Sequence, residues 1–186
     1  MTPEGTYVAF HASREKEPHA SGAECYRQLQ AWTAHSGEEL WIVSEQDKSA
    51  ARANAGLREV LRATVVNRLR HSRHLLLIVG GTTAEDTDWI PFEIAFAVDE
   101  CRIPIIASYL VTTQPIIRPF ADTDLASYWP PALRARIEDG SAGVIHIPFQ
   151  PKPVRAAMTR FDRTHFPKGG GLGWISEDAY RSWGMI

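Results

Sequence analysis

The sequence of 186 residues contains little cysteine and no long apolar run. Its two cysteines, Cys25 and Cys101, form neither a disulfide framework nor a CxxC metal or redox pair, so we expect two buried thiols in a cytoplasmic protein. No stretch reaches the ~18 consecutive apolar residues of a membrane-spanning helix. The first residues also lack a basic segment followed by an apolar one, so we expect neither a membrane span nor a secretion signal.

The sequence also lacks an excess of positive charge. With 20 Lys and Arg against 22 Asp and Glu, the net charge is -2, which provides no overall basic field for nucleic acid or an anionic membrane. We therefore expect no nucleic-acid partner. One stretch is nevertheless rich in arginine, which indicates either a solvated helix face or a site for a phosphate-bearing ligand or partner. It contains Arg52, Arg58, Arg62, Arg68, Arg70 and Arg73.

Several well-marked motifs are missing. Neither GxGxxG nor GxxxxGK[ST] occurs, which excludes the two best-marked phosphate loops. Ser13 is not part of a GxSxG turn, so the sequence does not indicate a Ser-His-Asp hydrolase. His71 and His74 stand three apart but have no third ligand at metal spacing, so we expect no metal site.

The sequence does contain short apolar or β-branched runs that alternate with helical patterns, which is typical of a parallel sheet with crossover helices. Its composition, 44% hydrophobic and 23% charged, is that of a folded globular domain. We predict an α/β, flavodoxin-like domain with a five-stranded parallel sheet in the order 2-1-3-4-5 and helices on both faces. The predicted strands are residues 6–11, 40–43, 74–79, 104–109 and 143–149.

Apolar residues spaced three and four apart predict the helices between these strands, at residues 21–37, 57–69, 89–101, 132–138 and 154–161. Residues 44–54 are predicted to be a polar loop, and the proline-rich residues 111–131 a surface excursion with little regular structure. We place the main domain at residues 1–165. Residues 166–186 are predicted to be a glycine hinge followed by an aromatic tail that docks on this domain or on a partner.

Glu93 is the residue whose position most indicates chemistry. It shares a helix face with Trp89, four residues earlier, whereas the remaining faces of that helix are apolar. A carboxylate in such a helix must be paired, protonated or turned into a cleft, because burying it unsatisfied is costly. Three interpretations stay open: a functional carboxylate, a structural ion pair with an arginine such as Arg73, or an acid that is favourable near a helix N-terminus.

The fold predicts where a ligand would bind. In a doubly wound sheet the ligand crevice lies beyond the carboxyl ends of the strands, here between the first and third strands. This geometry brings Phe10, His11 and Ser13 close to residues 80–83, and the helix that carries Glu93 begins at the same rim.

Three segments resemble TIR and TIR-like domains. They are Val8-Ala9-Phe10-His11, residues 71–83, and the sequence Asp-Trp-Ile-Pro-Phe-Glu-Ile at residues 88–94. The similarity extends over about residues 6–110 and points to the bacterial TIR-like group that includes the NAD-consuming subunit of Thoeris antiphage defence systems. Its most specific element is the WxxxE pair formed by Trp89 and Glu93 after a strand-Gly-Thr loop.

The resemblance implies that Glu93 is the catalytic residue that breaks the nicotinamide–ribose bond of NAD+, which is a substrate here rather than a cofactor. It further implies that a loop after the second strand closes over the ligand, in the stretch that contains Asp47 and Lys48. The implied substrate-binding residues are Phe10, His11, Ser13, Asp47, Thr82 and Trp89.

The resemblance also implies self-assembly through TIR surfaces and a role in antiphage defence. Because 186 residues leave no room for an attached effector, we expect a cyclic ADP-ribose-type product that a separate effector senses. The insertion at residues 15–19 and the proline-rich, aromatic C-terminal third depart from a minimal TIR domain.

Two other functions remain open. A nucleoside deoxyribosyltransferase-like enzyme would also place a glutamate beside an N-glycosidic bond. A non-catalytic TIR adaptor would act by protein–protein assembly alone.

Overall fold

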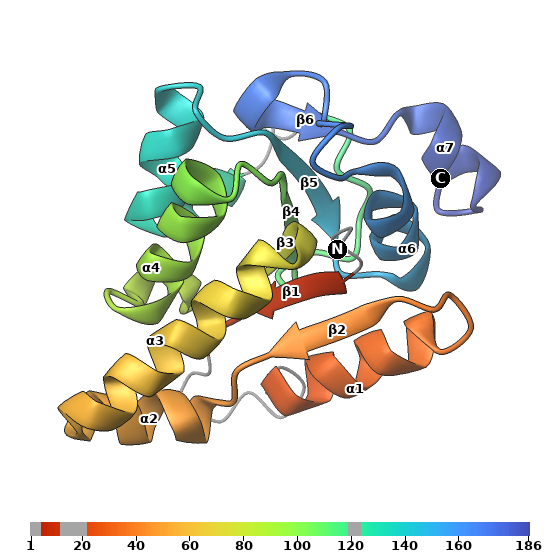
Figure 1. The fold of residues 1–186 in the computed structure, drawn as a ribbon. Helices are drawn as coiled ribbons and strands as arrows, with labels where there is room; N and C mark the ends of the chain where they lie inside the picture. The colour runs from red at the N-terminus through yellow and green to blue at the C-terminus, as the bar shows by residue number, and fades with distance from the viewer. Residues whose placement is uncertain (1–4, 12–21, 119–123) are drawn as a thin grey trace.

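A parallel sheet of six strands in the order β2-β1-β3-β4-β5-β6 forms the middle layer of the molecule (Figure 1). The computed structural model describes residues 5–11, 22–118 and 124–186. The flavodoxin-like fold and the order of the first five strands are as predicted, and a short sixth strand extends one edge. The strands are β1 (Gly5–Ala9), β2 (Glu39–Ile42), β3 (Ser72–Val79), β4 (Ile105–Tyr109), β5 (Val144–Pro148) and β6 (Gly173–Trp174).

Strand β3 lies at the centre of the sheet, as its continuous apolar run predicts. It pairs with β1 on one side and with β4 on the other, so that Leu76 lies beside both Val8 and Ile106. Leu75, Leu76 and Leu77 are all completely buried, because helices cover both faces.

The helices form two layers. On one face the core includes residues of α2 (Glu45–Ala53), α3 (Ala55–Arg70), α4 (Trp89–Ala95) and α5 (Pro131–Glu138). On the other face it includes residues of α1 (Gly22–Thr33), α6 (Pro151–Arg160) and α7 (Glu177–Ser182). Figure 1 shows the two layers on opposite sides of the sheet. In the described part of the chain, no helix is long and apolar enough to cross a membrane.

The stretch predicted to be a polar loop is mostly the helix α2. Ser44 caps its start by accepting a hydrogen bond from the backbone N–H of Asp47 at 3.1 Å, and Asn54 caps the start of α3 in the same way. Only Lys48 and Ala51 of this helix are buried, so its sequence shows no apolar period. The loop prediction was therefore wrong because the helix contributes so little to the core.

The helix predicted at residues 89–101 is present but changes its hydrogen bonding part of the way along. After α4 the chain forms a π-helical segment, Phe96–Glu100, which ends with the N–H of Cys101 bonded to the carbonyl of Phe96 at 3.0 Å. Pro91 lies in the first turn of α4, where its missing N–H costs no helical hydrogen bond.

The proline-rich excursion is not wholly on the surface. Ile116, Leu125 and Trp129 are buried in the core, and residues Asp124–Tyr128 form a short 3-10 helix, η3. The prediction of an irregular surface segment was wrong for these described residues, because the apolar side chains between the prolines supply core contacts.

The glycine-rich segment, predicted to be a hinge, belongs to the folded body. Residues Gly170–Leu172 form a 3-10 turn, η4, and the next two residues pair with β5 as strand β6. Gly173 lies so close to the carbonyl of Val144 that a Cβ there would be 2.7 Å from its oxygen, which leaves glycine as the residue that fits. After β6, α7 docks on this same domain and completely buries Tyr180.

Candidate active site

Helix α4 covers one face of the sheet and places Glu93 against Tyr7 of β1. The Glu93 side chain has no exposed surface. Its Oε1 atom accepts a hydrogen bond from the Tyr7 hydroxyl at 2.8 Å and lies 2.8 Å from the Lys48 ammonium. We call Tyr7, Lys48 and Glu93 the Glu93 cluster.

Lys48 reaches this cluster from helix α2. Its side chain is 2% exposed, and its nitrogen lies 5.9 Å from the centre of the Phe10 ring. A buried lysine requires a compensating negative charge, and Glu93 supplies it. Lys48 therefore covers and neutralises the carboxylate in this conformation.

The second oxygen of Glu93 differs from the first. Within the described residues, Oε2 has no hydrogen-bond partner. Burial raises the pKa of Glu93, although the charge of Lys48 and the hydrogen bonds from Lys48 and Tyr7 oppose this shift. Burial and the charge of Glu93 together raise the pKa of Tyr7 far above its ordinary value, so Tyr7 stays a neutral donor.

A second acid lies beside this cluster, at the start of α4. The Oδ1 atom of Asp86 accepts hydrogen bonds from the backbone N–H groups of Asp88 and Trp89, both at 2.9 Å, and so caps the helix. Its Oδ2 atom lies 3.0 Å from Nδ1 of His11, whose side chain is 19% exposed. Burial alone would raise the pKa of Asp86, but the bond from Asp88, the contact with His11 and the charge of Lys48 together lower it.

The contact between Asp86 and His11 fixes the orientation of the imidazole. Because the carboxylate is an acceptor, Nδ1 of His11 carries the proton, which leaves Nε2 as the acceptor of a neutral ring. A histidine held in this way can take a proton from a reacting hydroxyl group.

The structure brings some of the predicted binding residues together. Phe10 and His11 lie beside Lys48 and Asp86 respectively, and Trp89 is buried on the same helix as Glu93. Thr82 precedes the short helix η1 (Thr83–Glu85) and is half-buried. Ser13 lies outside the described residues.

Asp47 does not join the site. Its side chain is exposed and accepts a hydrogen bond from Ser44 at 2.7 Å, within the capping arrangement of α2. Its neighbour Lys48 is the residue of this stretch that reaches Glu93, because one position along a helix changes the facing direction by about 100°.

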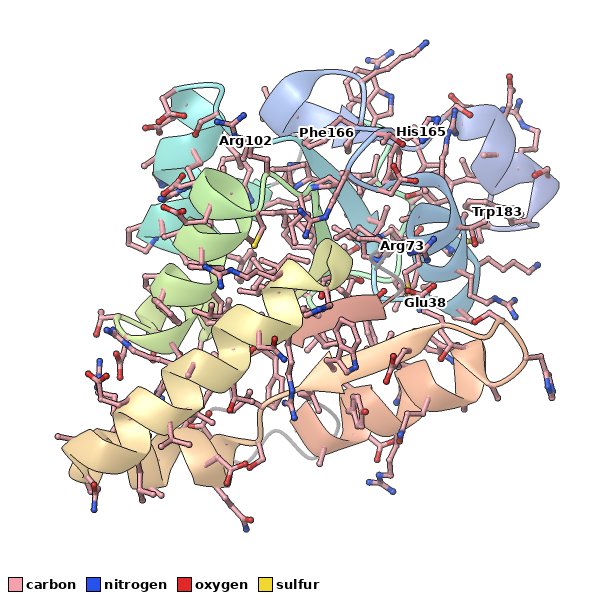
Figure 2. All side chains as sticks on the ribbon, in the orientation of Figure 1. Glu38, Arg73, Arg102, His165, Phe166 and Trp183 are labelled. Carbon is pink, nitrogen blue, oxygen red and sulfur yellow. The ribbon has the colours of Figure 1, made fainter. Side chains whose placement is uncertain are left out.

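The ion pair between Glu93 and Arg73 that the sequence left open is not formed. Arg73 instead pairs with Glu38, which directly precedes β2, and Figure 2 shows the two side chains next to each other. The other arginines of this stretch also have partners: Arg58 pairs with Asp88, and Arg62 lies over the Phe92 ring. These arginines therefore interact with other residues of the protein rather than forming a basic patch without partners.

The two histidines that the sequence singled out are not arranged as metal ligands. His74 is buried, with Nδ1 2.8 Å from the carbonyl of Phe161, whereas His71 lies near the carbonyl of Asn67 at the end of α3. Within the described ranges, no three His, Cys, Asp or Glu side chains gather as a metal site would require.

The resemblance placed Lys48 in the stretch expected to close over the ligand, but the sequence did not predict that Lys48 and Tyr7 contact Glu93. Tyr7 is one of several buried residues of β1, and Asp86 lies in the short loop between η1 and α4. Nothing in the pattern of apolar and polar residues therefore distinguishes either residue. The signal for Lys48 would have been a helix cap at Ser44 followed by a lysine on the face that Ala51 shares.

Comparison with known proteins identifies the family. The family model for the TIR-like domain of Thoeris protein ThsB matches residues 7–114, which is more than half of the chain. The matched region contains Tyr7, Lys48, Asp86 and Glu93. No curated protein matches the sequence. The chain therefore belongs to the TIR-like family of the Thoeris defence protein ThsB.

Proposed function

We propose that this TIR-like chain cleaves the nicotinamide–ribose bond of NAD+ and that Glu93 is its catalytic residue. The observation that supports this most is the state of the Glu93 carboxylate: Oε1 holds Lys48 and Tyr7, while Oε2 has no hydrogen-bond partner in the described part of the chain. A carboxylate that serves only as scaffold is expected to have both oxygens satisfied.

The reaction suits a single carboxylate. When the bond between the nicotinamide nitrogen and the ribose carbon breaks, the bonding electrons pass to the pyridinium ring, and nicotinamide leaves as a neutral molecule. No general acid is needed. Positive charge develops on the ribose in an oxocarbenium-like transition state. The buried Glu93 carboxylate stabilises that charge more strongly than it could in water.

Access to Glu93 requires Lys48 to move, because Lys48 and Glu93 are both buried. Helix α2, which carries Lys48, buries only one other residue, Ala51, so few core contacts hold it in place. In the conformation of the structure, the positive charge that faces Glu93 is the Lys48 ammonium. During the reaction, the nicotinamide ring and then the ribose would supply that positive charge. Lys48 therefore acts as an internal competitor of the substrate.

His11 is the proposed acceptor of the proton that the attacking group releases. Attack by water converts NAD+ and water to ADP-ribose, nicotinamide and one proton, and with Nδ1 held by Asp86 the basic position of the His11 ring is Nε2. Attack by a ribose hydroxyl or base nitrogen of the same molecule gives a cyclic isomer instead. We propose the cyclic product, sensed by a separate effector, with the enzyme assembled through its TIR surfaces.

The test is to incubate the purified chain with NAD+, with and without a crowding agent that promotes assembly, and to follow nicotinamide release and products by mass spectrometry. We expect nicotinamide and a cyclic ADP-ribose isomer. Glu93→Gln removes the release, whereas Glu100→Gln, an exposed glutamate at the end of the same helical region, preserves it.

Two outcomes would contradict the proposal. Intact NAD+ together with cleaved deoxynucleosides would identify a deoxyribosyltransferase-like enzyme. Intact NAD+ with assembled protein and no cleavage of either substrate would identify an adaptor.

A further inference from the structure

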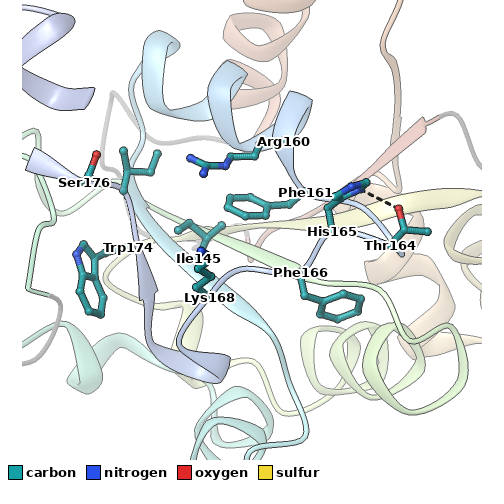
Figure 3. Close-up of a pocket in the computed structure, with 10 residues that line it drawn as sticks. Ile145, Arg160, Phe161, Thr164, His165, Phe166, Lys168, Trp174 and Ser176 are labelled. Carbon is teal, nitrogen blue, oxygen red and sulfur yellow. Dashed lines mark hydrogen bonds between the residues drawn. The ribbon is translucent and has the colours of Figure 1, made fainter. Parts of the chain in front are cut away.

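A groove of about 510 Å³ lies at the edge of the sheet formed by β5 and β6 (Figure 3). Its apolar floor includes Ile145, Phe161 and Ile175. Around this floor stand two cations, Arg160 and Lys168, and the exposed ring of Trp174, and the lining also includes Thr164, His165, Phe166 and Ser176. The volume is within the range of ~300–1,000 Å³ that is usual for small-molecule sites.

The groove is separate from the Glu93 cluster. Ile145, Phe161 and Ile175 belong to the core on the face covered by α1, α6 and α7, whereas Tyr7 belongs to the core on the opposite face. Strands β3 and β4 also lie between β1 and β5, which places the groove about 14 Å away along the sheet from the strand spacing alone. A ligand in the groove would therefore not touch Glu93.

The lysine and arginine in the lining of the groove are both cationic, and the neighbouring carboxylate of Asp162 is bound to Thr164 and His165. The lining includes Arg160 and Lys168 but no aspartate or glutamate. No ion pair of the described residues involves either cation, although the chain as a whole carries a net charge of -2. Two unpaired cations at one hollow favour an anionic ligand.

The aromatic side chains add a second preference. Trp174 is 52% exposed and Phe166 is 43% exposed, which is unusual for side chains of this size. Trp174 is held in place because β6 pairs with β5, with His146 opposite Trp174 in the register. In Figure 3, Trp174 stands on one side of the hollow and Phe161 and Arg160 on the other, with Ile145 and Lys168 between them. An exposed, fixed indole beside cations suits a planar ring that carries phosphate.

We propose that this groove is a second ligand site, which binds a nucleotide with its phosphate on Arg160 and Lys168 and its base against Trp174. This site is additional to the proposed NAD+ cleavage and does not depend on it.

Isothermal titration of the 186-residue chain with AMP tests the site, because AMP has no nicotinamide bond to cleave. We expect AMP to bind, adenosine and inorganic phosphate each to bind more weakly, and the affinity for AMP to fall as salt is raised. The double variant Arg160→Gln/Lys168→Gln should lower the affinity for AMP at least about 10-fold, and Trp174→Leu should lower it about 5-fold or more. Arg155→Gln, an exposed cation of α6 outside the groove, should leave the affinity unchanged.

A thermal melt of each variant establishes that it is folded. The proposal is overturned if AMP does not bind to the folded wild-type protein, if adenosine binds as tightly as AMP, or if both groove variants retain full affinity. Loss of AMP binding in Lys48→Met with retention in the groove variants would assign AMP to the Glu93 cluster and would also overturn it. None of these readouts uses NAD+ cleavage, so they are distinguishable from a failure of the proposed function.

Discussion

Two fully buried tyrosines on the same face of the sheet belong to hydrogen-bonded clusters that differ in kind. Tyr7 on β1 is hydrogen-bonded to Glu93 at 2.8 Å, and Tyr109 on β4 to His146 at 2.7 Å. Both pairs belong to a hydrophobic layer in which an unsatisfied polar atom is costly. They differ in whether every polar atom of the titratable partner, Glu93 or His146, has a hydrogen bond.

The cluster around Tyr109 is satisfied at both ends. The Nε1–H group of Trp129 donates to the Tyr109 hydroxyl at 2.7 Å, that hydroxyl donates to Nδ1 of His146, and Nε2 of His146 donates to the carbonyl of Gly171 at 2.8 Å. These bonds connect β4, β5, the segment before α5 and the turn η4. Such a network fixes one conformation, which is a structural role.

The Glu93 cluster instead leaves Oε2 without a hydrogen-bond partner in the described structure and depends on a lysine from a weakly anchored helix. It keeps a charge buried where the Tyr109 cluster keeps a neutral ring. The contrast is therefore that one oxygen of the Glu93 carboxylate has no hydrogen-bond partner among the described residues, whereas both ring nitrogens of His146 have one. The predictions below test this contrast.

The largest effect is expected from acid. Burial lowers the pKa of His146 from 6.5 to about 4, and it lowers that of His74 equally. As the pH falls, the unfolded chain therefore protonates these histidines before the folded chain does. The free energy of unfolding decreases between pH 6.5 and pH 4, by about 3 kcal/mol for each histidine. Urea unfolding between pH 7 and pH 4 measures this loss. His146→Gln should remove about half of the dependence on pH, and an unchanged dependence would contradict the structural role of His146.

The next effect is expected from Lys48→Met. Without the lysine, Glu93 must be protonated to stay buried, and from its ordinary value of 4.5 this costs about 3 kcal/mol of unfolding free energy at pH 7. Because a raised pKa favours the protonated form, the deficit should shrink as the pH falls toward 4.5.

The double variant Lys48→Met/Glu93→Gln is the control for this prediction. It removes both charges and should recover most of the stability, which a double-mutant cycle measures. Equal losses in the single and double variants would show that the ion pair contributes nothing.

The two tyrosines themselves supply the smallest effect. Tyr109→Phe leaves both the indole N–H of Trp129 and Nδ1 of His146 without that partner, which should cost about 2 kcal/mol. Tyr7→Phe leaves Glu93 Oε1 still bound to Lys48, so about 1 kcal/mol is expected. Thermal or urea unfolding of the two variants side by side measures the difference, and a larger loss for Tyr7→Phe would reverse the comparison.

Much of the fold could be predicted because its elements carry strong periodic signals. The apolar run of β3 and the Trp89 to Glu93 spacing on α4 are visible in the sequence. Helix α2 is not, because Lys48 and Ala51 are its only buried residues and a buried lysine resembles a surface one in sequence. Strand β6 is also hidden, because its glycine is selected by the close approach of Val144 rather than by flexibility.

The same limit applies to the site. Glu93 could be singled out because a carboxylate interrupts an apolar helix. Lys48 could be placed in the stretch after the second strand by resemblance, but its pairing with Glu93 could not be predicted, since the two residues are far apart in sequence and meet only through tertiary packing. The arginine-rich stretch offered a more obvious partner, Arg73, but β3 directs that side chain to Glu38.

The most direct test of the central claim compares one residue from each cluster. Nicotinamide release from NAD+ should be measured for wild type, Glu93→Gln and His146→Gln, each expressed per folded molecule. We predict that Glu93→Gln lowers the rate about 10²-fold or more, because the amide cannot stabilise the positive charge on the ribose. His146→Gln should lower stability but leave the rate per folded molecule unchanged. Wild-type release by folded Glu93→Gln protein would show that Glu93 is part of the scaffold and would contradict the account.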